Sequence, residues 1–289
     1  MLFSTNTNST AKIFGLAESV RKIAMAGFPA VDISFFKKEE YAFVFDKKSL
    51  EDMAKSINDI VKETGIVIDQ AHAPFVADMT LLDEEMPYIF DFCGMIGVKN
   101  IVVHPCHTKR YYGNEKETFD RNIEYYKTLI PYAKKNGIKI ALENMWQRHP
   151  ITKNICDDIY ADPYELVRAY DTLNDPDAFT ICLDLGHVAL CGREPEDVIR
   201  IIGKERLGAL HVHDVDYRSD IHTMPGVIGI IKWEEVWRAL GEIDYRGTLT
   251  LEADYFADKF GAEMHDTVLK FMADITRNYA ARVDSYRNK

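Results

Sequence analysis

The sequence has few cysteines and lacks an excess of positive charge. Its five cysteines form an odd set without C-x-x-C spacing, which gives no thiolate metal site and is typical of buried free thiols in a reducing compartment. Acidic residues outnumber basic ones by 46 to 35, so the formal net charge is −11. A surface of this charge repels a polyanion unless a basic patch overrides it locally. We therefore expect no nucleic-acid partner.

Long hydrophobic runs are also missing. No stretch approaches the roughly 20 apolar residues of a membrane-spanning helix. The N-terminal segment MLFSTNTNSTAKIFGL lacks the basic region and the apolar run of roughly 7–15 residues that mark a secretory signal. These absences predict a cytoplasmic protein without a membrane partner.

Short β-rich runs alternate with longer segments of helical period along the whole chain. The strand candidates are 2–5, 30–35, 66–72, 100–104, 138–143, 179–184, 210–213 and 248–252. Amphipathic segments between or after them include 16–25, 50–62, 119–135, 163–173, 233–240 and 264–282. Strict alternation of this kind indicates parallel strands with crossover helices, and hence the α/β class.

The pattern inside the strands favours a closed barrel over an open sheet. In Ile181–Asp184 and Thr248–Glu252, residues in phase with the terminal acid are small or polar, while Ile and Leu occupy the other face. A barrel strand needs a bulky face under the helices and a tighter face toward the interior. We therefore predict that residues 1–289 form a single (β/α)8 TIM barrel domain, with about 36 residues in each unit.

Polar side chains end six consecutive predicted strands. They are His72, His104, Glu143, Asp184 with His187 close behind, His213 and Glu252. The loop after His213 adds Asp220 and His222, whose i, i+2 spacing lets both point the same way. The carboxyl ends of all strands in a closed barrel meet at one mouth, so we expect these groups to lie close together.

A cluster of histidines and carboxylates without cysteine favours Mn²⁺, Mg²⁺, Co²⁺, Zn²⁺ or Fe²⁺. Gathering several acids and histidines without a cation would cost many kcal/mol in repulsion and desolvation. The sequence therefore predicts a divalent metal site and leaves the identity and number of the metal ions open.

The motifs ALEN, LDLGH, HVHDVD followed by DIH and PGVIGIIKW, and LEAD resemble the xylose-isomerase-like barrel superfamily, particularly its sugar epimerases and sugar-phosphate isomerases. Likeness to the ketose 3-epimerases implies a metal held by Glu143, Asp184, His213 and Glu252. It also implies a small carbohydrate substrate, contacted by His187 and, more approximately, by Arg218. Members often form dimers or tetramers, so a homo-oligomer is a further expectation.

The resulting hypothesis is a sugar or sugar-phosphate isomerase or epimerase that transfers protons through a metal-stabilised enediolate. Glu143 and Glu252 would carry the protons, on opposite faces for epimerisation or with one glutamate alone for isomerisation. Trp146 would stack on the sugar or pack at the rim, and His211 would orient the ligands from behind.

Two other activities remain open. An endonuclease IV-like phosphodiesterase of the same superfamily would use nine ligands in the order found here: His72, His104, Glu143, Asp184, His187, His213, Asp220, His222 and Glu252. The acidic balance and the lack of Gly- and Ser-rich stretches around these residues disfavour it. An inosose dehydratase-type lyase is chemically adjacent, because the same enediolate can expel a β-hydroxyl group.

Overall fold

The computed structural model describes residues 1–75 and 79–287 and contains an eight-stranded sheet whose neighbouring strands are parallel. The strand order is β10-β1-β2-β3-β4-β5-β8-β9. Their bounds are β1 Phe3–Asn6, β2 Ala30–Ser34, β3 Val67–His72, β4 Asn100–Val103, β5 Lys139–Glu143, β8 Phe179–Asp184, β9 Leu207–His211 and β10 Leu249–Leu251.

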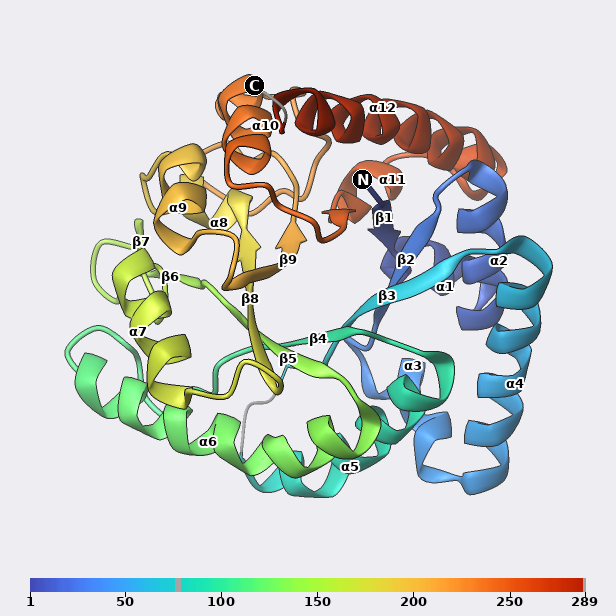
Figure 1. Cartoon of the computed structure of the whole chain (residues 1–289), viewed down its shortest axis with the longest axis horizontal. Coiled ribbons are helices and arrows are strands. Elements are labelled where there is room, and N and C mark those ends of the chain that lie inside the picture. Colours follow the sequence, from blue (N-terminus) through green and yellow to red (C-terminus); the bar gives the residue numbers. More distant parts are fainter. Residues whose placement is uncertain (76–78, 288–289) are drawn as a thin grey trace.

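The sheet closes on itself. At one side of the ring β1 pairs with β10, in register from Phe3 with Leu249. On the other side of β10, Val212 bridges Leu251, with its amide donating to the Thr250 carbonyl at 2.9 Å. The ring of helices around the strands is seen end-on in Figure 1. The predicted TIM barrel is therefore confirmed, and each of the eight predicted strands is present.

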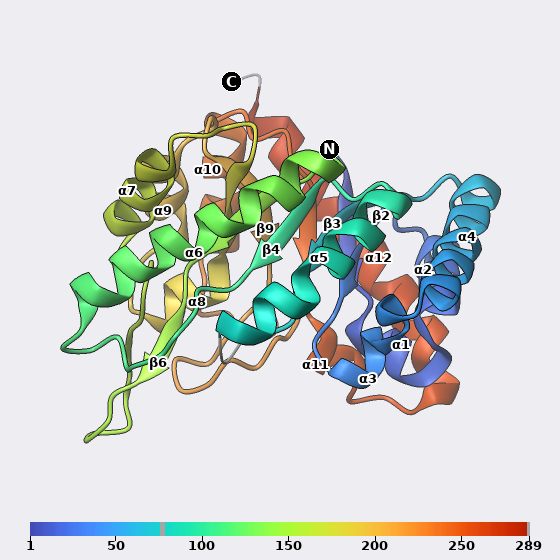
Figure 2. The same cartoon turned by 90° about the horizontal axis from the view of Figure 1, so that it is seen from below.

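The larger helices cover the outside of the barrel, and shorter ones follow strand ends. The bounds are α1 Asn8–Phe14, α2 Leu16–Ala26, α3 Lys38–Tyr41, α4 Lys47–Thr64, α5 Met79–Ile96, α6 Glu115–Asn136, α7 Pro163–Leu173, α8 Leu185–Leu190, α9 Pro195–Ile202, α10 Trp233–Glu242, α11 Asp254–Ala257 and α12 His265–Tyr286. In Figure 2 the short helices α1, α3, α8 and α11 lie at the lower end of the barrel. Among the described residues, no helix has the length and apolar character needed to cross a membrane.

Helix α4 shows how the local sequence fixes these elements. Asp46 caps its start by accepting a hydrogen bond from the Ser49 amide at 2.8 Å, and Gly65 ends it with a left-handed φ of 75°. Its buried side chains, Leu50, Ala54, Ile57 and Ile60, recur every three or four residues and face the barrel.

Strand β9 of the barrel and a separate two-stranded hairpin differ from the prediction. Strand β9 begins at Leu207, three residues before the predicted start, and contains Gly208, a poor strand former. A Cβ atom at Gly208 would lie 2.2 Å from Thr180 Oγ1, so the glycine permits a close approach of β8. The antiparallel hairpin of β6 (Trp146–Arg148) and β7 (Ile155–Asp157) was not predicted, because its strands are short and largely polar.

The barrel interior contains a small apolar cluster that is separate from the main core between strands and helices. It consists of Val102, Ala141, Cys182 and Ala209. Two positions after each of them comes a polar residue: His104, Glu143, Asp184 and His211. Side chains two positions apart on a strand point to the same side, so these polar residues also face the interior, nearer the mouth. This layer supports the site from below.

Candidate active site

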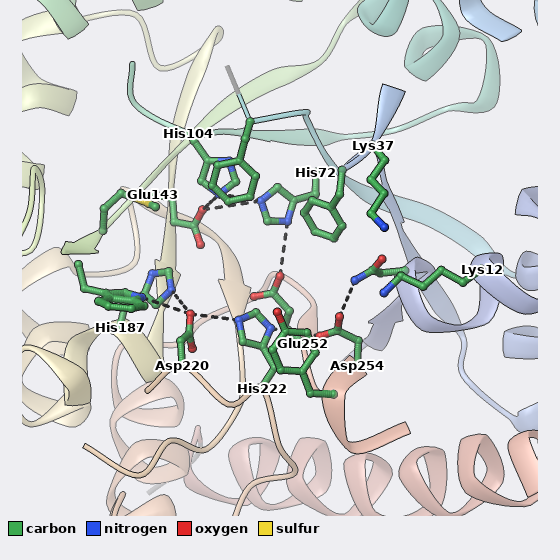
Figure 3. Close-up of a pocket in the computed structure, with 16 residues that line it drawn as sticks. Lys12, Lys37, His72, His104, Glu143, His187, Asp220, His222, Glu252 and Asp254 are labelled. Carbon is green, nitrogen blue, oxygen red and sulfur yellow. Dashed lines mark hydrogen bonds and ion pairs between the residues drawn. The ribbon is translucent and has the colours of Figure 1, made fainter. Parts of the chain in front are cut away.

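A cavity of about 490 Å³ opens at the mouth where the strands end. Figure 3 shows the polar side chains that face it. Of the residues proposed from the sequence, those that line it are His72, His104, Glu143, Trp146, His187, Asp220, His222 and Glu252. Asp184 and His213 are fully buried. Both make close contacts with residues of the lining, so all these groups form one connected network.

Three carboxylates converge on one imidazole nitrogen. His211 Nδ1 lies 2.8 Å from Glu143 Oε1, 3.3 Å from Glu252 Oε2 and 3.8 Å from Asp184 Oδ2. The other ring nitrogen lies 3.0 Å from Gln70 Nε2, and Gln70 Nε2 lies 3.2 Å from Asp32 Oδ2. These contacts fix the plane of the imidazole. His211 thus has the orienting position expected from the sequence, in contact with both glutamates.

His72 and His104 lie beside Glu143 at the ends of β3 and β4. Their Nε2 atoms are 3.0 Å apart, and His104 Nε2 is 3.0 Å from Glu143 Oε2. The ring of Phe75 stacks on His104 with centroids 3.8 Å apart. One ligand atom from each of His72, His104 and Glu143 lies within 4.8 Å of the others, close enough to share a cation.

The LDLGH segment positions Asp184 and makes room for His213. Asp184 Oδ1 accepts from the His187 amide at 2.7 Å and so caps α8. His213 Nε2 lies 3.0 Å from Asp184 Oδ2. A Cβ atom at Gly186 would lie 2.1 Å from His213 Cε1, so the glycine leaves the space that the imidazole occupies. The motif therefore places a carboxylate and an imidazole against each other.

Asp220 joins two further histidines on the loop after β9. Asp220 Oδ2 lies 3.0 Å from His187 Nε2 and 3.1 Å from His222 Nε2, and it accepts a hydrogen bond from Trp146 Nε1 at 3.2 Å. His222 has a φ of 36°, in the left-handed region that non-glycine residues seldom adopt. Its Nδ1 atom lies 3.1 Å from Asp254 Oδ1. Backbone strain of this kind is common where side chains are held for a function.

Burial and opposite charges shift the titration of these groups. Burial alone would raise the pKa of Glu143, but His211 and His104 hold it well below its usual value. The pKa of Glu252 is lowered in the same way by His211 and His222, against the effect of burial. Burial opposes protonation of His187, yet Asp184 and Asp220 raise its pKa to about 10. Without a cation, protonated histidines therefore neutralise the carboxylates.

The donor set fits a divalent cation. His213 Nδ1 and Asp220 Oδ1 are 3.7 Å apart, and neither has a hydrogen-bond partner among the described residues. Buried polar atoms without partners are costly, and a cation between carboxylate and imidazole would satisfy both. Oxygen and imidazole ligands suit Mg²⁺, Mn²⁺, Co²⁺ and Zn²⁺.

Arg218, expected from the sequence to contact substrate, and Asp214 lie outside the cavity lining. Arg218 is exposed, lies outside the lining, and accepts at its carbonyl from Arg148 Nη2 at 2.8 Å. Asp214 organises the following loop, with Oδ2 accepting from the amides of Gly226, Ile228 and Gly229. Arg218 therefore does not have the position in the cavity lining that a substrate contact would need.

Sequence reasoning did not single out Asp254, Lys12 or Lys37, all of which line the cavity. Asp254 follows Glu252 by two residues, and this spacing could have indicated a second acid on the same side. Lys12 lies on α1 and Lys37 directly precedes α3, after the first two strands, where no conspicuous motif marks them.

Comparisons with known proteins place this fold and mouth in a family. The profile of the xylose isomerase-like TIM barrel family matches residues 20–275. The chain belongs to this family, as its motifs had suggested.

Curated relatives match parts of the chain. An uncharacterized protein of Methanocaldococcus jannaschii is 30% identical over 155 residues, which are 53% of this chain and 50% of that protein. The inosose dehydratase of Lacticaseibacillus casei is 25% identical over 124 residues, 37% of this chain and 41% of the dehydratase. The chain thus spans half or less of the length of these curated relatives.

Solved structures resemble it over nearly the whole length. A D-tagatose 3-epimerase-like protein has a TM-score of 0.76 at 21% identity, covering 99% of both chains. D-allulose 3-epimerase of Methylomonas sp. in complex with D-allulose has a TM-score of 0.70 at 16% identity, covering 99% of this chain and 97% of the epimerase. At these identities the likeness shows the fold alone.

Proposed function

We propose that the protein is a divalent-metal-dependent sugar isomerase or epimerase, formed by residues 1–289 as one domain. The observation that carries the proposal is the pairing of two buried glutamates in one cavity. Glu143 and Glu252 both line the cavity, and each has an oxygen within 3.3 Å of the same His211 nitrogen. Two carboxylates placed this closely can both reach one small substrate.

Glu143, Asp184, His213 and Glu252 would hold the metal. When bound there, a divalent cation would withdraw electron density from a carbonyl oxygen and the neighbouring hydroxyl, and so acidify the C–H bond between them. The lowered pKa values of Glu143 and Glu252 keep both carboxylates deprotonated but also make them weak bases, so proton transfer to either would depend on acidification of the C–H bond by the cation. His211 would hold the two glutamates in place through its contacts with both.

The outcome depends on which carboxylate returns the proton. Removal by one glutamate and return by the other, on the opposite face of the carbon, inverts that carbon and gives epimerisation. Removal and return by the same glutamate, at the neighbouring carbon, interconverts an aldose and a ketose. His187 and Trp146 line the same cavity and would contact substrate hydroxyls and the apolar face of the sugar.

Hydrogen–deuterium exchange tests the proposal. Protein reconstituted with Mn²⁺, Mg²⁺, Co²⁺ or Zn²⁺ is incubated in deuterated water with ketoses, aldoses and their phosphates, and incorporation at carbon is followed by NMR. We expect metal-dependent deuterium incorporation into at least one sugar together with a new isomer. Failure of every sugar to exchange with any of the four metals would contradict the proposal.

The second candidate is a lyase, supported by the partial similarity to an inosose dehydratase. The same proton abstraction followed by loss of a hydroxyl group would release water. Product analysis in ordinary water distinguishes the two, because a dehydrated product has a mass lower by one water and an isomer has an unchanged mass.

A further inference from the structure

The cavity has two chemically different ends. Glu143 and His187 lie at one end, and Lys12 and Lys37 lie at the other, where Asp254 is beside Lys12 (Figure 3). Lys12 lies on α1, and Lys37 directly precedes α3. Figure 3 shows both ammonium groups on the side of the cavity opposite Glu143 and His187.

The charges of these two lysines are poorly neutralised by the protein. Lys37 Nζ makes no ion pair with any side chain that the structure describes. Lys12 Nζ lies 3.7 Å from Asp258 Oδ2, which is too long for a hydrogen bond. The other oxygen of Asp258 accepts from Ser9 Oγ at 2.5 Å. Lys37 therefore has no carboxylate partner among the described residues, and Lys12 has one long ion pair that leaves its ammonium group free to donate to a ligand.

Asp254, the nearest acid of the lining, is already engaged. Its Oδ2 atom accepts from Asn8 Nδ2 at 2.5 Å, and its Oδ1 atom lies 3.1 Å from His222 Nδ1. Each oxygen of Asp254 thus has a partner other than a lysine. The neighbouring Lys38 differs, because its Nζ lies 2.5 Å from Glu85 Oε1 and it does not line the cavity.

We propose that Lys12 and Lys37 form a subsite for an anionic terminal group of the substrate, which is therefore a sugar phosphate or a sugar acid. The inference rests on the proposed function, in which the reacting carbons lie at the carboxylate end. Ammonium groups donate strong charge-assisted hydrogen bonds to phosphate and carboxylate oxygens. A protein of net charge −11 repels an anionic substrate unless local positive charges attract it. A cavity of about 490 Å³ has room for a phosphorylated sugar between the two ends.

Calorimetric titration of the Mn²⁺-reconstituted protein with non-reacting polyols tests the subsite. The probes are D-sorbitol 6-phosphate, D-gluconate and D-sorbitol, which lack a ketone or aldehyde group and so report binding alone. We expect one anionic probe to bind at least about tenfold more tightly than D-sorbitol. Preference for the phosphate identifies a sugar phosphate, and preference for gluconate identifies a sugar acid. Equal affinity for the three probes would overturn the proposal.

Lysine variants show where the anion binds. Lys37→Gln and Lys12→Gln should each weaken binding of the preferred anionic probe about tenfold and leave binding of D-sorbitol unchanged. Lys38→Gln is the matched control and should bind all three probes as the parent protein does. Lys37→Arg should keep most of the affinity because it keeps the charge. Unchanged anion binding in both glutamine variants would refute the subsite, and thermal unfolding establishes that each variant is folded.

The two proposals fail in different ways. Lysine-dependent binding of an anionic polyol, without deuterium exchange on any sugar, would contradict the proposed activity and support the subsite. Efficient deuterium exchange on neutral sugars, without any preference for anionic ones, would contradict the subsite and support the proposed activity.

Discussion

Four strands each contribute to two layers of side chains inside the barrel. The lower layer is small and apolar, formed by Val102, Ala141, Cys182 and Ala209. Two positions further along lie the residues of the mouth layer, His104, Glu143, Asp184 and His211. Both layers are buried, yet one is held by packing and the other by charges. Two residues along each strand therefore separate a layer that stabilises the barrel from a layer that carries the reactive groups.

The largest loss of activity is expected from substitution of the two glutamates at the mouth. Glu143→Gln and Glu252→Gln should each lower kcat for sugar conversion by roughly 10²–10⁴-fold, because an amide cannot accept the substrate proton. Glu124→Gln, on the exposed face of α6, should retain full activity. Near-parental kcat in either mouth variant would exclude that glutamate as a proton carrier.

Gly186→Ala should disturb the metal site without replacing any of the proposed ligands. The added methyl group would occupy the space of the His213 ring, which must move. We expect metal affinity to fall by roughly 10–100-fold, as when a ligand loses its orienting contacts. Gly94→Ala, which clashes with Asn136 in the helix layer, provides a control that perturbs packing elsewhere. A metal titration that gives the same affinity for both variants would show that His213 is not a ligand.

The protonated histidines around the cavity predict that metal affinity depends on pH. The pKa of His187 is raised to about 10 and that of His222 well above its usual value, so both are protonated at pH 7 in the metal-free protein. A cation close to these imidazoles repels their positive charge and favours loss of such protons, so affinity should fall as pH falls, by about tenfold per pH unit for each proton released. Calorimetry in buffers of different ionisation enthalpy counts those protons. A pH-independent affinity would contradict this description.

The smallest effect on activity is expected from a substitution in the lower layer. Ala141→Leu adds volume inside a packed barrel and should lower the free energy of unfolding by about 1–3 kcal/mol. Ala281→Leu, on the exposed face of α12, should change it little. Denaturant unfolding measures both. Loss of metal binding without loss of stability in Ala141→Leu would show that the two layers are not separable as described.

The fold could be predicted from the sequence because strand and helix periods alternate so regularly. The start of β9 could not, because Gly208 serves a contact with Thr180 that only the folded barrel reveals. The β6–β7 hairpin also escaped prediction, since its strands are three residues long and largely polar.

The candidate ligands could be identified because each lies at a strand end, where the barrel topology alone brings them together. Which oxygens approach which nitrogens depends on side-chain geometry, as at His211, and no spacing in the sequence encodes that. The lysine end was overlooked because Lys12 and Lys37 lie far apart in the sequence and outside any motif. Their common position arises because α1 and the segment before α3 follow the neighbouring strands β1 and β2.

The closure of the barrel between β1 and β10 has a consequence for biogenesis. Phe3 pairs with Leu249, so the ring requires a contact between segments about 246 residues apart. Glu252 directly follows the strand that makes this contact. During synthesis the ring therefore cannot close until the last strand has been made, and the proposed metal site would be complete only then.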